Sequence, residues 1–244
     1  MDIIETTLLN KRVKLLQPKE GFHASIDTVF LAAAVPAKSG DNLLDMGCGV
    51  GSAGLCVMER VSGCTLTGID TQKSLVDIAQ ENASLNGISD RTTFICADIR
   101  TDIAIPERAF HCVLMNPPYL EDGKHTPSPN VSRAMANGED ALLEDWIRYA
   151  FAKLIKGGNL VIIHRADRLD DLMEALRIED FGAITIYPLW PKAGSLAKRI
   201  IVSARKHKKS PLVLHPGMIL HEADGKYTAE ADDVLLEKEG ISIL

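Results

Sequence analysis

The tetrapeptide Asn116-Pro117-Pro118-Tyr119 combines residue types that point directly to chemistry. It follows the apolar run Cys112 to Met115, which is typical of a buried strand. Because proline cannot donate to a sheet ladder, the two prolines must end that strand and leave the preceding carbonyl oxygens free as acceptors. The sequence therefore predicts a rigid strand tip that presents an amide side chain, carbonyl oxygens and an aromatic ring.

Such a tip suits transfer of a methyl group to a poorly nucleophilic nitrogen, such as an amide nitrogen or the amino nitrogen of adenine. The Asn116 side-chain oxygen and the Pro117 carbonyl would accept its two N–H groups and favour the pyramidal form, as the inverse of an oxyanion hole. Tyr119 would stack on the planar group. No general base is needed, since the methylated nitrogen can lose its proton afterwards. We predict that Asn116, Pro117, Pro118 and Tyr119 are the catalytic residues.

A glycine-rich motif at residues 45–51, Asp45-Met46-Gly47-Cys48-Gly49-Val50-Gly51, predicts a ligand-binding turn between a strand and a helix. Glycines let the backbone turn sharply and bring its N–H groups close to a ligand, and the helix N-terminus favours a carboxylate or another anion. Asp70 closes the next expected strand, where a carboxylate would meet ribose hydroxyls. S-adenosylmethionine and a nicotinamide cofactor both fit, because residues 49–54 also read Gly-x-Gly-x-x-Gly.

The hydrophobic pattern predicts alternating strands and helices that would place both motifs at one edge of a parallel sheet. An open α/β sheet binds ligands beyond the carboxyl ends of its strands, and the aperiodic residues 120–138 would cover that site. The expected strands are residues 13–16, 42–46, 65–69, 93–96, 110–115 and 160–163, with 183–187 and 200–204 as a final antiparallel hairpin. The expected helices run from Ser25 to Pro36 and over residues 52–59, 72–86, 141–155 and 169–176, with a turn at 17–21 and with Gly157-Gly158 ending the fourth helix.

Length and composition exclude several classes of protein. A chain of 244 residues with 25% charged residues is expected to form one large globular domain. Its apolar runs are far shorter than the roughly 20 residues that span a bilayer, and no signal core opens the sequence, so we expect a cytoplasmic protein. Five cysteines without a C-x-x-C pair and seven histidines without ligand spacing argue against a metal site.

The charge is unevenly distributed along the chain. The net charge is −6, yet residues 188–209 hold seven lysines or arginines and no acid, whereas the tail from residue 221 is acid-rich. A basic edge of this kind is compatible with phosphate contacts, although a solvated surface is the alternative. We predict RNA contacts at Lys198, Arg199, Arg205 and Lys206.

The sequences DMGCGVG at 45–51, GID at 68–70, CAD at 96–98 and NPPY at 116–119 together resemble the class I S-adenosylmethionine-dependent methyltransferases of the "small" type. Within these, residues 17–37 and 198–206 are similar to the tRNA adenine-N6 methyltransferase family that acts on an anticodon-loop adenine of valine tRNA. The resemblance implies a Rossmann-like α/β fold, with a seven-stranded, mostly parallel sheet whose last strand is antiparallel. It also implies S-adenosylmethionine as cofactor and tRNA as partner.

The resemblance also assigns cofactor contacts. It implies that Asp45, Gly47, Gly49 and Gly51 line the methionine moiety, that Asp70 binds the ribose and that Asp98 binds the cofactor adenine. Cys48 and Asn116 complete the predicted cofactor-binding set.

We therefore predict an enzyme that methylates the exocyclic N6 of an adenine in tRNA. Its expected parts are an N-terminal extension formed by a hairpin and a helix (1–40), a methyltransferase catalytic domain (41–210) and an acidic C-terminal extension (211–244). A protein glutamine methyltransferase is the nearest alternative, but that family carries a helical domain before the glycine motif, where only 44 residues stand here. A nicotinamide-dependent oxidoreductase would leave NPPY unexplained. A non-catalytic module that binds S-adenosylmethionine is a further alternative. The sequence predicts neither a monomer nor a homodimer in preference to the other.

Overall fold

The computed structural model describes residues 2–20, 23–101, 105–118, 142–236 and 239–243. Within these ranges the main sheet has nine strands, and seven of them lie in the spatial order β5-β4-β3-β6-β7-β9-β8. Of these seven strands, β9 alone runs opposite to the others, so the predicted antiparallel last strand is confirmed. These strands are β3 (Asn42–Met46), β4 (Thr65–Asp70), β5 (Thr92–Cys96), β6 (Phe110–Met115), β7 (Leu154–Arg165), β8 (Phe181–Trp190) and β9 (Arg199–Lys206).

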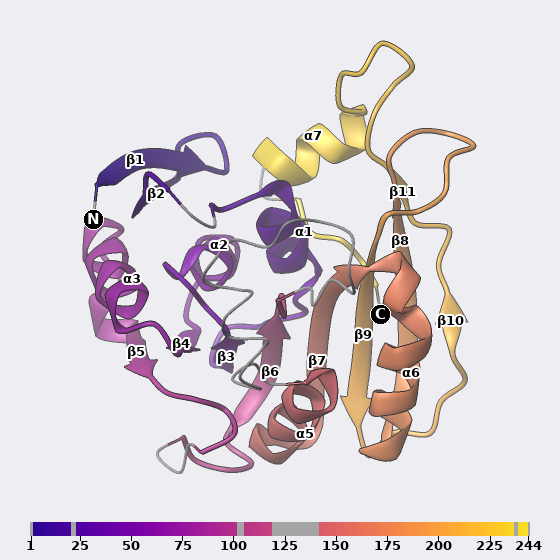
Figure 1. Cartoon of the computed structure of the whole chain (residues 1–244), viewed down its shortest axis with the longest axis horizontal. Helices are drawn as coiled ribbons and strands as arrows, with labels where there is room; N and C mark the ends of the chain where they lie inside the picture. Colours follow the sequence, from indigo (N-terminus) through magenta and orange to yellow (C-terminus); the bar gives the residue numbers. More distant parts are fainter. Residues whose placement is uncertain (1, 21–22, 102–104, 119–141, 237–238, 244) are drawn as a thin grey trace.

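Helices cover both faces of this sheet (Figure 1). On one face lie α1 (Ile26–Ala34), α2 (Ser52–Arg60) and α3 (Lys73–Leu85), and on the other lie α5 (Leu143–Lys153) and α6 (Leu169–Ile178). Successive strand residues serve opposite cores: Leu43 packs with the first group, and Leu44 packs with the second. Because strands of this kind are buried on both faces, they appear in the sequence as nearly continuous apolar runs. Two short 3-10 helices, η1 (Ser89–Arg91) and η2 (Ala166–Arg168), complete the alternation.

Two predicted boundaries are wrong at the junction of α5 and β7. The sequence pattern predicts a helix up to residue 155 that Gly157 and Gly158 end, whereas α5 ends at Lys153 and β7 begins at Leu154. Both glycines lie inside the strand, where Gly157 has a φ of +77° and the pairing with β6 shifts register. Glycine at such an irregularity is typical of a β-bulge. The sequence pattern extended the helix too far because residues 154 and 155 are apolar, which suits the buried face of a helix and a buried strand equally.

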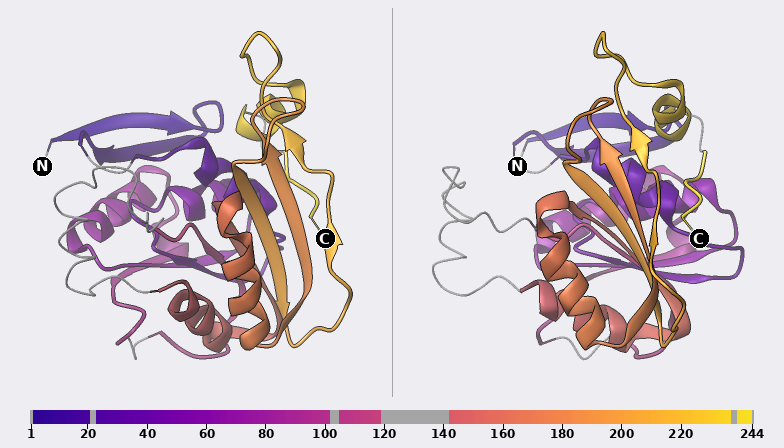
Figure 2. Two further views of the ribbon diagram at one scale, coloured as in Figure 1. Left: turned by 45° about the vertical axis from the view of Figure 1, so that its right-hand side comes forward. Right: turned by 90° about the vertical axis from the view of Figure 1, so that its right-hand side faces the viewer.

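The ends of the chain add elements for which the hydrophobic pattern gave no residue ranges, namely β1, β10, β11 and α7. β1 (Ile3–Leu8) forms a hairpin with β2 (Val13–Pro18), so the turn predicted at residues 17–21 begins later than expected. The tail forms β10 (Val213–Leu214) and β11 (Met218–Ile219), which both pair with β8, and then α7 (Ala229–Leu236). Figure 2 shows the β1–β2 hairpin and α7 toward the same end of the molecule. The division at residues 40 and 210 stays a prediction.

The tail is held against α1 and α2 through its backbone. The Ile241 N–H donates to the Ala33 carbonyl oxygen at 2.8 Å. At the C-terminus of α7, the Arg60 guanidinium donates to the Val234 carbonyl at 2.7 Å, and the Arg12 guanidinium donates to the Leu236 carbonyl at 2.6 Å. The last carbonyls of a helix have no partner within the helix, and cations there also interact favourably with its dipole.

We expect Arg60→Ala to lower the free energy of unfolding by about 2 kcal/mol, since a hydrogen bond from a charged donor contributes roughly 1.5–3 kcal/mol. Urea denaturation measures this loss. Arg177→Ala removes the same charge from the exposed last turn of α6 and should change stability by less than about 0.5 kcal/mol. Equal losses in the two variants would show that Arg60 does not anchor the tail.

Candidate active site

The carboxyl ends of the parallel strands bring the predicted motifs to one edge of the sheet. Met46, the last residue of β3, lies opposite Ile69 of β4 on one side and Met115 of β6 on the other. The glycine loop, Asp70 and Asn116 follow these three residues directly. The tertiary structure thus places both sequence motifs side by side, although about 70 residues separate them along the chain.

The glycine loop is tied to β4 and leaves bare backbone facing open space. The Cys48 N–H donates to the Ile69 carbonyl at 2.9 Å, and the Gly51 N–H donates to the Cys48 carbonyl at 2.8 Å. Gly49 has a φ of +53°, and a Cβ placed on it would meet no atom within 4 Å. This open space beside unshielded backbone fits the close approach of a cofactor.

Cys48 points away from that space. Its thiol is buried, and the sulfur would lie 3.0 Å from a Cβ placed on Gly68 of β4. Burial, together with the charges of Asp45 and Asp70, raises the pKa of the thiol well above its ordinary value. The Cys48 side chain therefore packs in the core beneath the loop, so a cofactor contact predicted for this residue would have to use its backbone.

Asp45 is also buried beneath the loop. One of its carboxylate oxygens accepts the Gly54 N–H in the first turn of α2 at 2.9 Å. Burial and the charge of Asp70 raise the pKa of Asp45 to about 7, while the Gly54 hydrogen bond opposes this rise. Gly54 itself must lack a side chain, because a Cβ there would lie 3.1 Å from the Asp45 oxygen and 2.5 Å from Leu66. Asp45 thus holds the start of α2 against β3.

The raised pKa of Asp45 makes its contribution to stability depend on pH. The folded protein retains a proton that the unfolded chain has lost, so this contribution is present at pH 4 and is lost as the pH rises toward 7. At about 1.4 kcal/mol per pKa unit, the cost at pH 8 is a few kcal/mol. We expect Asp45→Asn, whose amide oxygen can still accept the Gly54 N–H, to be more stable than the wild type at pH 8.

Denaturant unfolding of the wild type and Asp45→Asn at pH 5 and pH 8 tests this expectation. The advantage of the variant should shrink markedly at pH 5, where Asp45 of the folded wild type is already protonated. Asp90→Asn changes an exposed carboxylate in η1 and should show no such dependence. An advantage of equal size at both pH values would contradict the buried-carboxyl explanation.

Asp70 ends β4, and Asp98 lies two residues beyond the end of β5, in a different environment. The Asp70 carboxylate accepts the Gly49 N–H and the Gln72 N–H, each at 2.9 Å, so it orders the glycine loop directly. Asp98 is held by Arg100, whose guanidinium donates to its carboxylate at 2.6 and 3.1 Å. The Arg100 hydrogen bonds lower the pKa of Asp98, which therefore stays ionised. A ligand at Asp98 would share this carboxylate with Arg100.

The strand tip continues the same edge. Asn116 is half-buried, Pro117 is buried and Pro118 is exposed, while Tyr119 and residues 120–138 lie outside the described residues. A pocket of about 170 Å³ adjoins the two prolines. Its remaining walls come from the start of α5, the end of β7 and the start of α6, with Leu142, Leu143, Glu144, Trp146, His164, Arg165, Arg168 and Asp171 as lining residues.

Trp146 connects this pocket to the glycine loop. A Cβ placed on Gly47 would lie 2.7 Å from the Trp146 Cη2 atom, so the indole ring packs directly on the backbone of the loop. The same side chain lines the pocket beside Pro117. The sequence analysis placed Trp146 in the apolar stripe of a helix and gave it no role in the site. The hydrophobic periodicity of a helix predicts which residues are buried, but it does not show which of them lies beside the active site.

The four predicted RNA contacts are divided between opposite ends of β9. Lys198 and Arg199 lie at its start, beside the active edge, where Arg199 pairs with Asp27 of α1 at 2.9 Å. Arg205 and Lys206 lie at its other end, and Arg205 donates to the Gly157 carbonyl at 3.1 Å. Lys206 is buried, and its ammonium donates to the Leu154 carbonyl at 2.8 Å. Its charge is used beneath the end of α5, and a phosphate contact at Lys206 stays a prediction.

Within the described ranges, no group of three or more His, Cys, Asp or Glu side chains could hold a metal ion. No helix among those residues is long and apolar enough to cross a membrane.

Comparison with known proteins gives the family. The model of the methyltransferase small domain family matches residues 23–177. A tRNA1(Val) (adenine(37)-N6)-methyltransferase of Haemophilus influenzae is 25% identical over 206 residues, which cover 83% of this chain and 84% of the relative. A protein of the same name from Porphyromonas gingivalis is 32% identical over 133 residues, which cover 53% of this chain and 51% of the relative. The crystal structure of a predicted O-methyltransferase from Agrobacterium tumefaciens is 27% identical, with a TM-score of 0.74 and coverage of 88% of this chain and 97% of that one. Since the family model spans more than half of the sequence, the chain belongs to the methyltransferase small domain family and is an S-adenosylmethionine-dependent methyltransferase.

Proposed function

We propose that this enzyme methylates the exocyclic N6 of an adenine in tRNA. The observation that carries the proposal is the position of the Asn116-Pro117-Pro118 tip, which stands beside the glycine loop and opens onto a pocket. The name and the coverage of the Haemophilus influenzae relative support tRNA as the substrate class. An adenine in a loop costs least to remove from its stack, which favours such a position for the target.

The residues of the tip would activate the acceptor nitrogen. In this proposal, the Asn116 side-chain oxygen and the Pro117 carbonyl accept the two N–H groups of the adenine amino group and favour its attacking geometry. Tyr119 would stack on the base. Bound S-adenosylmethionine supplies the methyl group on a sulfonium that needs no further activation. The rest of the rate would come from holding the nitrogen in line with the methyl carbon.

The glycine loop and two carboxylates would hold the cofactor. Gly49 offers its backbone to open space, and Asp70, which orders the loop and is partly exposed, would bind the ribose hydroxyls. Asp98 stays ionised beside Arg100 and would accept the amino group of the cofactor adenine. Asp45, Gly47 and Gly51 support this arrangement through the packing of the loop and of the first turn of α2.

Methyl transfer from radiolabelled S-adenosylmethionine tests the proposal. Purified enzyme would be incubated with tRNA that lacks modifications and, separately, with a mixture of proteins. After complete digestion of the tRNA, we expect the label in N6-methyladenosine. Label in the side-chain amide of glutamine would support the protein-modifying alternative, and label in neither acceptor would overturn the proposed substrate class.

A further inference from the structure

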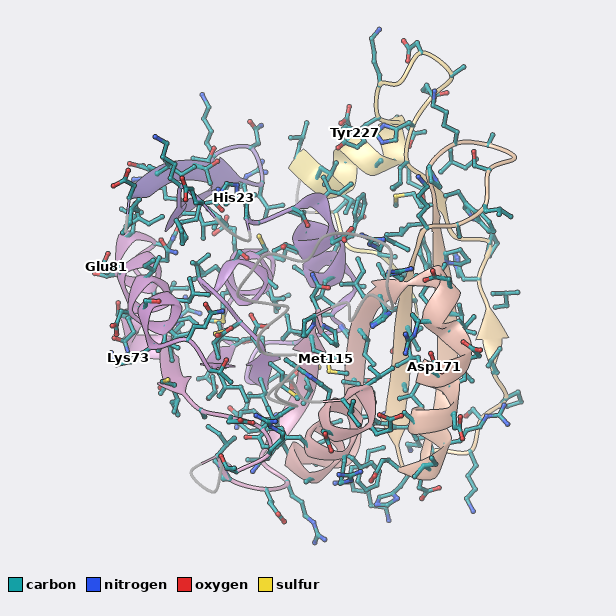
Figure 3. The ribbon with its side chains drawn as sticks, viewed as in Figure 1. His23, Lys73, Glu81, Met115, Asp171 and Tyr227 are labelled. Atoms are coloured by element: carbon teal, nitrogen blue, oxygen red, sulfur yellow. The ribbon has the colours of Figure 1, made fainter. Side chains whose placement is uncertain are left out.

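One wall of the pocket beside the tip is rich in arginine. Arg165 ends β7 and Arg168 ends η2, and both line the pocket together with Pro117 and Pro118. In Figure 3, Met115 marks the end of β6, and Asp171, which lines the pocket, marks α6. A third arginine, Arg199, begins β9 directly opposite Arg165.

The positive charges of Arg165 and Arg199, which lie opposite each other, need neighbouring negative charges. Like charges directly opposite each other on paired strands destabilise a sheet. Each guanidinium accordingly has its own carboxylate: Arg165 pairs with Asp167 at 2.5 Å, Arg168 with Asp171 at 2.6 Å, and Arg199 with Asp27 at 2.9 Å. The side chain of Asp167 is 61% exposed, whereas that of Asp27 is 14% exposed. Because an exposed ion pair contributes little to stability, a second anion can share the Arg165 guanidinium at low cost.

A buried histidine of the same pocket lies within range of the three arginine charges. His164 is buried between β6 and β9 and lines the same pocket. Its pKa is lowered first by burial, and then by the charges of Arg168, Arg165 and Arg199. The guanidinium charges thus reach this wall of the pocket, which Glu144 and Asp171 also line.

We propose that Arg165 and Arg168 bind a phosphate of the substrate backbone next to the target nucleotide. The apolar wall formed by Pro118, Leu142 and Trp146 would accommodate the planar base of that nucleotide. A guanidinium matches phosphate geometry with paired N–H donors, which a lysine at the same place would not reproduce. This inference rests on the proposed function and makes it more specific. The acceptor would be a polynucleotide, because the glutamine side chain of a protein carries no phosphate.

Equilibrium binding of unmodified tRNA tests the inference without relying on turnover. The dissociation constant of Arg165→Gln and of Arg168→Gln should rise about tenfold. The slope of log affinity against log salt concentration should become shallower by about 0.7 for the lost phosphate contact. Arg165→Lys should restore most of the slope but not all of the affinity. Arg177→Gln, at the far end of α6, serves as the matched control and should bind as the wild type does.

Labelled methyl transfer and thermal melting run in parallel separate the possible outcomes. Wild-type affinity and slope in Arg165→Gln and Arg168→Gln, with tRNA still methylated by the wild type, would overturn the phosphate site and leave the proposed function intact. Weakened binding in these variants without methylation of tRNA by the wild type would support the site and overturn the proposed function. Weakened binding that follows a loss of melting temperature and does not recover in Arg165→Lys would assign these residues a structural role only.

Discussion

Replacing Asn116 with alanine is expected to reduce kcat by at least about a hundredfold while leaving much of the affinity for S-adenosylmethionine. The proposed role of Asn116 is to accept an N–H of the attacking nitrogen as positive charge develops there. Removing one such preorganised hydrogen-bonding group from an active site costs about 10²–10³ in rate. Single-turnover methyl transfer measures the rate, and calorimetry with S-adenosylmethionine measures cofactor binding.

Asn42→Ala provides the control for this experiment. Asn42 begins β3 at the opposite end of the sheet, where its side-chain oxygen accepts the Thr65 hydroxyl at 2.8 Å. It should cost some stability and leave the rate per folded molecule unchanged. Undiminished turnover in Asn116→Ala would refute the role assigned to the tip. Loss of cofactor binding equal to the loss of turnover would move Asn116 to a cofactor-binding role alone.

Gly47→Ala and Gly49→Ala should fail in different ways, although both glycines have a positive φ, +67° and +53°. A left-handed conformation costs a residue with a side chain about 1–2 kcal/mol in either position. At Gly47 the new Cβ would also meet Trp146 at 2.7 Å, and overpacking of this kind adds roughly 1–3 kcal/mol. At Gly49 it would enter the open space that the cofactor is proposed to occupy.

We therefore expect Gly47→Ala to lose stability and Gly49→Ala to lose affinity for S-adenosylmethionine, by a factor of about ten for each 1.4 kcal/mol of lost contact. Denaturation and calorimetry on both variants measure the two effects. Trp146→Leu in the Gly47→Ala background should recover part of the lost stability, and this double-mutant cycle isolates the contact. Equal affinity for the cofactor in both variants would contradict the placement of the cofactor beside Gly49.

The comparisons confirm methyl transfer as the class of reaction, and the geometry of the site bears on which atom accepts the methyl group. The overlapping Gly-x-Gly-x-x-Gly pattern had allowed a nicotinamide-dependent oxidoreductase, and the family match to residues 23–177 decides for methyl transfer. A protein called a predicted O-methyltransferase and relatives called adenine-N6-methyltransferases are both similar to this chain. The tip favours nitrogen, because an amide oxygen and a carbonyl can accept N–H groups but are too weakly basic to deprotonate a hydroxyl.

The sequence by itself determined the motifs and the central alternation of strands and helices. Strands of the parallel sheet are buried on both faces, so their apolar runs predicted the first and last residues of β3 and β6. The prolines after Met115 marked where β6 stops. The glycine motif predicted the loop between β3 and α2, because three residues with positive φ in one short turn need glycine. Each of these features depends on residues that are close together along the chain.

Only the tertiary structure decided which distant residues meet. Trp146 lies against Gly47 because α5 packs where β3 ends, and Arg165 faces Arg199 because of the register between β7 and β9. Lys206 is buried for the same reason, since the direction of β9 carries it to the end of the sheet opposite Arg199. Strand order, direction and register depend on packing across the whole domain, so local composition cannot specify them.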